Sequence, residues 1–69
     1  MRDREVYHVM PRGKYDWQVR SEDAEKIISI HDTKREAVAA GKKVAENHEP
    51  SRLVIHKEDG AIQVTYTYG

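Results

Sequence analysis

Apolar and polar residues alternate along two stretches of the chain, as they do in strands that bury one face. In the stretch 15–20 the apolar positions are Tyr15, Trp17 and Val19. In the stretch 61–68 they are Ile62, Val64, Tyr66 and Tyr68. Runs rich in β-branched or apolar residues at 6–10, 26–31 and 52–56 predict three further strands.

Turn residues separate these runs. Pro11 is expected to end the first strand, and Gly13 can adopt the positive φ of a tight turn before the second strand. A polar loop is expected at 21–25. Asp59 followed by Gly60 is a strong hairpin signal, so the last two strands are expected to pair as a hairpin.

A helix is predicted to begin after Thr33. Thr33 and Glu36 have the spacing of a capping box, in which the Thr hydroxyl accepts from the Glu36 amide and the Glu carboxylate from the Thr33 amide. Pro50 requires the helix to end by about Asn47 or His48. Small residues form its apolar stripe: Ala37, Ala40, Gly41 and Val44. A helix with such a narrow stripe can lie close to a sheet.

The order of elements is therefore β-β-β-α-β-β, and the expected fold class is α+β. We expect one compact domain over residues 1–69, a single antiparallel sheet of about five strands with one helix packed on one face. Trp17 fills the space beside the small helix residues and is expected in the core. The other sheet face is left open, with Asp16 among its polar positions.

The open face is where we look first for a binding site. Its candidate residues come from the strands and the first turn: His8, Arg12, Lys14, Gln18, Arg20, Val54, His56, Thr65 and Thr67. The basic members could contact nucleic-acid phosphates, although Asp16 and the acidic loop favour a mixed, solvated surface. An apolar residue such as Val54 could instead contact another protein.

Composition narrows the function classes. The chain has 69 residues, 12 Lys and Arg against 12 Asp and Glu, and no Cys. This rules out disulfides and Cys-based zinc sites, and the neutral balance argues against a general polyanion binder. No apolar run reaches the ~20 residues of a membrane span, and the N-terminus has no signal-peptide core, so a cytoplasmic location is expected. A core this small leaves burial against a second copy open.

Catalysis and metal binding find no support in the residue pattern. No two His residues have the spacing of a zinc site, so His8 and His56 are expected to form local hydrogen bonds. No nucleophile with an adjacent base and no Gly-rich phosphate loop is evident. We therefore expect no catalytic residues, no metal, no cofactor and no enzymatic activity.

Six short segments, taken in order, resemble a small prokaryotic family known as domain of unknown function 2188. They are His8-Val9-Met10-Pro11, Trp17-Gln18-Val19, Thr33-Lys34-Arg35-Glu36-Ala37, Leu53-Val54-Ile55-His56, Asp59-Gly60-Ala61-Ile62 and Tyr68-Gly69. Asp16 stands where such sequences often have Gly. The resemblance implies a compact cytoplasmic domain and no particular activity.

A second, local resemblance covers about half the chain. Trp17-Gln18-Val19-Arg20, a strand, and then Thr33-Lys34-Arg35-Glu36-Ala37 are similar to the amino-terminal arm-binding domains of tyrosine integrases. Those domains lay a three-stranded sheet in a DNA groove, so this likeness implies nucleic-acid binding by analogy.

Two functions are compatible with these sequence patterns. The first is a non-enzymatic module that binds another protein, or a second copy of itself as a homodimer, through the open face or a sheet edge. The alternative is a nucleic-acid-binding domain that uses the sheet face and the first turn.

Overall fold

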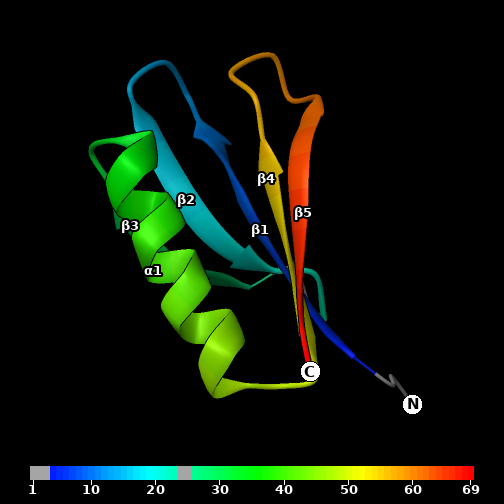
Figure 1. Cartoon of the computed structure of the whole chain (residues 1–69). Helices are drawn as coiled ribbons and strands as arrows, with labels where there is room; N and C mark the ends of the chain where they lie inside the picture. The colour runs from blue at the N-terminus through cyan, green and yellow to red at the C-terminus, as the bar shows by residue number, and fades with distance from the viewer. Residues whose placement is uncertain (1–3, 24–25) are drawn as a thin grey trace.

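The computed structural model describes residues 4–23 and 26–69 and shows the predicted order of elements (Figure 1). The first three strands are β1 (Glu5–Arg12), β2 (Asp16–Ser21) and β3 (Ile27–His31). The helix α1 (Lys34–Asn47), β4 (Ser51–His56) and β5 (Ile62–Tyr68) follow. Ala24 and Glu25 of the expected polar loop lie outside the described residues.

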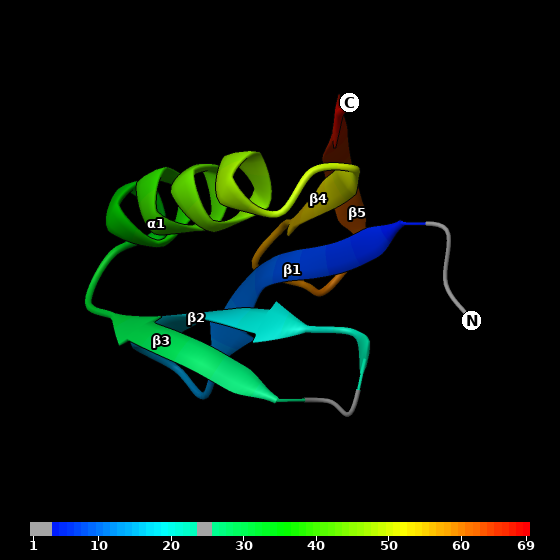
Figure 2. The same ribbon diagram turned by 90° about the horizontal axis from the view of Figure 1, so that it is seen from below.

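The five strands form one sheet in the order β3-β2-β1-β4-β5, with α1 along one face (Figure 2). The α+β class is confirmed, but the prediction of a purely antiparallel sheet is wrong, because β1 and β4 pair in parallel. The reason is the helical crossover. A helix that runs back along the sheet returns the chain to the end where β1 and β3 begin, so β4 enters beside β1 in the same direction.

Two boundaries differ from the sequence pattern. Pro11 does not end β1, because it stands opposite Trp17, and Arg12 stands opposite Asp16. The hairpin turn therefore tightens to residues 13–15, with Gly13 at φ 68°. Tyr15 is left in this turn with 82% of its surface exposed, instead of sharing the buried face of Trp17.

A bulge changes the start of β5. The pairing register of β4 and β5 shifts between Ile55 and His56, so Ile62 stands opposite His56. Directly opposite residues share a face. Ile62 therefore leaves the face of Val64 and Tyr66, and 63% of its surface is exposed.

The core lies between the sheet and α1. Leu53, Val9 and Val19 are fully buried, and Trp17 is 8% exposed, which confirms its place in the core. Gly41 of α1 lies so close to the sheet that a Cβ atom there would stand 2.8 Å from Val9 Cγ2. The small-residue stripe thus does what the sequence predicts, with Ala45 buried in addition to the predicted members Ala37 and Gly41.

The helix begins at its predicted cap. The Glu36 amide donates to Thr33 Oγ1 at 3.1 Å. The Glu36 carboxylate accepts from the Thr33 hydroxyl at 3.0 Å, where the capping-box pattern predicts the Thr33 amide. At the other end His48 is the C-cap residue, and its Nδ1 bonds the Val44 carbonyl at 2.8 Å.

Candidate functional site

The strand register brings most of the predicted binding residues onto the sheet face opposite α1. His8 of β1 stands between Arg20 of β2 and Val54 of β4, and Thr65 of β5 continues the same row. The neighbouring rows hold Gln18, opposite Met10, and His56, opposite Ile62, while Thr67 pairs with Arg52. Arg12 lies at the end of β1, and Lys14 lies in the hairpin turn. Their use in binding stays a prediction.

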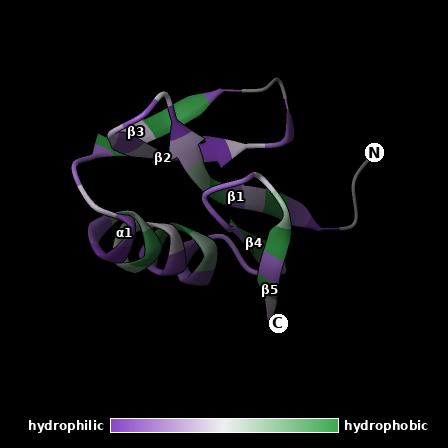
Figure 3. Ribbon diagram, turned by 90° about the horizontal axis from the view of Figure 1, so that it is seen from above, coloured by the Kyte–Doolittle hydropathy of each residue, from purple (hydrophilic) through white to green (hydrophobic). Residues whose placement is uncertain are grey.

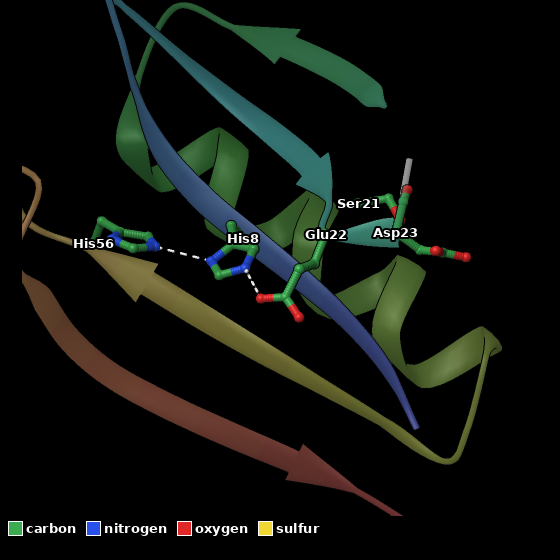
Figure 4. Close-up of polar contacts among 5 residues, drawn as sticks. All are labelled: His8, Ser21, Glu22, Asp23 and His56. Atoms are coloured by element: carbon green, nitrogen blue, oxygen red, sulfur yellow. Dashed lines mark hydrogen bonds and ion pairs between the residues drawn. The ribbon is translucent and has the colours of Figure 1, made fainter. Parts of the chain in front are cut away.

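A chain of hydrogen bonds crosses this face (Figure 4). His8 Nε2 lies 3.0 Å from Glu22 Oε1, and His8 Nδ1 lies 2.9 Å from His56 Nε2. His56 Nδ1 lies 2.9 Å from the Gly60 carbonyl oxygen. The chain therefore links the end of β2 to the β4–β5 turn through two imidazole rings. The sequence predicts local hydrogen bonds for these histidines but not that they bond each other.

The Gly60 carbonyl can only accept, so His56 Nδ1 is the donor in its hydrogen bond to Gly60. The contact between His8 and Glu22 is an ion pair when the His8 ring is protonated.

The surface beside the two rings is hollowed. A cavity of about 230 Å³ is lined by Met10, Arg20 and Ser21 together with the histidines and Glu22. Each ring nitrogen of His8 and His56 faces a hydrogen-bond partner, so the two rings do not aim at a shared point. Within residues 4–23 and 26–69 no three His, Asp or Glu side chains gather as a metal site would need.

Carboxylates accompany the basic residues of the open face. Arg12 forms an ion pair with Asp16, with 3.4 Å between Nη1 and Oδ2. Arg20 lines the same cavity as Glu22. The face therefore presents mixed charge, as the composition predicts. A phosphate backbone would meet carboxylates here as well as cations.

Two residues of the open face are buried although no helix or strand of the described residues covers them. Val54 is 7% exposed and Gln18 is 6% exposed. The Gln18 Oε1 atom has no hydrogen-bond partner among the described residues. An unsatisfied buried acceptor costs about 1–3 kcal/mol, which a donor from a bound molecule could recover.

The edge strand β5 is a second candidate surface that the sequence reasoning did not single out. Its seven residues, Ile62–Tyr68, contain no charged residue and no proline. Proteins usually protect edge strands with charged residues or proline, because an unprotected edge strand pairs readily with a strand of another chain. Figure 3 shows hydrophobic segments on both edge strands, β3 and β5.

The two edges differ in regularity. The pairing of β5 with β4 runs through five successive residue pairs, from Ser51–Tyr68 to Ile55–Val64, before its bulge. The pairing of β3 with β2 runs through three, from Trp17–His31 to Val19–Ser29. Because bulges twist an edge away from a partner, β5 offers the longer straight edge.

A groove of about 430 Å³ lies between α1 and β5. Ile55 and Val64 contribute apolar side chains from the sheet, and Val38 contributes one from the helix. Lys34 and Arg35 also line it, and none of the carboxylates in residues 4–23 and 26–69 does. The groove is therefore apolar in its floor and cationic along its helix side.

The cations beside β5 are held in place. The Lys34 ammonium donates to Gln63 Oε1 and lies 5.1 Å from the centre of the Trp17 ring. The Lys42 ammonium lies 4.8 Å from the centre of the Tyr66 ring. The two ring contacts are of the cation–π type, worth about 0.5–1 kcal/mol at exposed sites. The contacts with Gln63 and Tyr66 place both ammonium groups beside β5.

Tyr68 ends β5 and does not line this groove. Burial raises the pKa of the Tyr68 phenol, and the negative charge of Glu46 and the neighbouring Tyr66 raise it further.

Comparison with known proteins identifies relatives but no activity. A family model described as "Uncharacterized protein conserved in bacteria (DUF2188)" matches residues 7–68. The "Uncharacterized protein YdaT" of Bacillus subtilis (strain 168) is 36% identical over 56 residues, which are 81% of this chain. The match covers 36% of the length of that relative. No solved structure matches. In the part of the chain that the structure describes, no helix is long and apolar enough to cross a membrane.

Proposed function

Since the chain belongs to the bacterial family DUF2188, described as uncharacterised, we propose a function from the geometry: the domain binds another protein by adding an extended segment to the edge of β5. One observation carries the proposal. In a chain with 35% charged residues, the seven residues of this edge strand carry no charge and no proline. Main-chain hydrogen bonds along such an edge supply affinity without a deep pocket.

The occupant of the edge is a segment of a partner protein. Homotypic pairing, in which the β5 strands of two copies meet, uses the same edge and is an outcome of the test below. The proposed action is binding without catalysis. That restriction and the cytoplasmic location stay predictions from the sequence.

The open face is the competing surface. The unpaired Gln18 Oε1 favours a ligand there, because a donor from that ligand would satisfy a buried acceptor. The hydrogen bonds of the two histidines disfavour a ligand there, because the ring nitrogens of His8 and His56 already bond each other, Glu22 and the Gly60 carbonyl. Nucleic acid remains the second candidate partner. Asp16 and Glu22 beside Arg12 and Arg20 weaken that alternative.

The test is a titration of ¹⁵N-labelled protein with a short peptide of alternating valine and threonine, followed by NMR. The proposal expects shifted amide signals along 62–68 and slowed hydrogen exchange at alternate residues of β5, because every second residue directs its N–H away from β4. Concentration-dependent shifts of β5 without peptide would support the same edge with a second copy as occupant. Shifts confined to the open face or to β3, or no shifts, would overturn the proposal.

A further inference from the structure

We infer that the segment captured by β5 is acidic, with its carboxylates on the helix side, opposite Val64 and Tyr66. This inference rests on the proposed strand addition at β5 and goes beyond it by naming the chemistry of the partner. It is carried by the cationic helix side of the groove and by the geometry of a paired strand.

The side chains of the bound segment that can contact the cations are those that lie on the same sheet face and close enough to them. In an antiparallel pair, directly opposite residues have Cβ atoms about 4.5–5.5 Å apart and share a face. Val64 and Tyr66 face α1, since both line the groove with Val38. A glutamate opposite either of them would extend its carboxylate over the same groove, toward Lys34, Arg35 and Lys42.

Among the described residues, the two lysines beside β5 contact neutral groups. Lys34 contacts a neutral amide oxygen and an aromatic ring, and Lys42 contacts an aromatic ring. The nearest carboxylate on the first turn of the helix, Glu36, already accepts from the Thr33 hydroxyl. An incoming carboxylate would therefore complete ion pairs instead of displacing existing ones.

The experiment compares labelled extended peptides by fluorescence anisotropy: valine alternating with glutamate, with lysine, and with threonine. The acidic peptide is expected to bind about threefold to tenfold tighter than the neutral one at low salt, and the basic peptide is expected to bind weakest. At about 0.5 M NaCl the difference should shrink to less than about twofold, because exposed charges are then screened.

Matched charge reversals locate the effect. Arg35→Glu should remove most of the preference for the acidic peptide over the neutral one. Lys43→Glu makes the same change in net charge on an exposed helix position outside the groove, and it should keep most of the preference. Arg35→Gln is a milder second variant, and circular dichroism of each variant checks that it folds.

The two proposals fail in different ways. Equal binding of the three peptides, or equal effects of Arg35→Glu and Lys43→Glu, would overturn the inference that the segment is acidic. The proposal of strand addition at β5 would not be affected. Absence of binding by all three would overturn strand addition and the acidic segment together. Tighter binding of labelled oligothymidine than of the acidic peptide would assign the cations to a nucleic acid and overturn the inference.

Discussion

Replacing Gly41 with alanine tests how closely α1 packs on the sheet. Two opposing effects act at this position. In a helix interior, alanine is more favourable than glycine by roughly 0.5–1 kcal/mol. The new methyl group, however, would stand 2.8 Å from Val9 Cγ2 and 3.0 Å from Leu53 Cδ1. Carbon atoms in good contact are about 3.5–4.0 Å apart, so the helix must move outward.

The size of the destabilisation by Gly41→Ala follows from the side chains that surround this position. Val9 and Leu53 are both 0% exposed, so neither side chain has free space to turn into. Overpacking of such a site costs about 1–3 kcal/mol. Set against the gain in helix propensity, the net expectation for Gly41→Ala is a loss of about 1 kcal/mol in the free energy of unfolding. For so small a domain this lowers Tm by roughly 4–8 °C.

Urea denaturation followed by the fluorescence of Trp17 measures this change. Ala39→Gly, on the exposed side of the same helix, is the control for propensity alone and should cost up to about 1 kcal/mol. In a Val9→Ala background the closest contact disappears, and Gly41→Ala should then be neutral or stabilising. A gain in stability from Gly41→Ala in the native background would refute the close packing of α1 on β1 and β4.

Three further predictions concern single side chains. Thr33→Ala should lower the free energy of unfolding by about 1 kcal/mol in urea denaturation, because the Glu36 amide loses its acceptor. Burial, and then the charge of Glu5, raise the pKa of Tyr7 above its unfolded value of 10.0. The neutral phenol therefore stabilises the folded protein below about pH 10, and this stabilisation is lost as the pH rises further. Denaturation across this range should show a shallower alkaline loss for Tyr7→Phe than for the native protein. Two-bond ¹H–¹⁵N spectra should show a hydrogen on His56 Nδ1, where it donates to the Gly60 carbonyl, and a hydrogen on Nε2 alone would contradict this bond.

Local patterns predicted the helix and the existence of the strands because they depend on neighbours in the sequence. The cap at Thr33 and the end near His48 follow from hydroxyl and proline chemistry within a few residues. The position of Trp17 in the core follows from alternation, combined with a helix stripe that leaves room for a large ring.

Features that depend on long-range pairing could not be read in this way. The parallel pairing of β1 and β4 is set by the path of the helical crossover. The bulge at His56 turns Ile62 to the opposite face, which strict alternation cannot reveal. The contact of His8 with His56 joins residues 48 positions apart and requires β1 and β4 to be neighbours. That β5 is an edge strand is likewise known only once the order of the sheet is known.

Strand addition at β5 is tested most directly by isotope-filtered NOE spectra of ¹³C,¹⁵N-labelled protein with the unlabelled valine–glutamate peptide. Strand addition predicts backbone NOEs between the peptide and alternate residues of β5. It also predicts contacts from glutamate side chains to Lys34 and Lys42. NOEs from the peptide to Met10, Val54 or Thr65 side chains on the open face, without backbone contacts to β5, would contradict it.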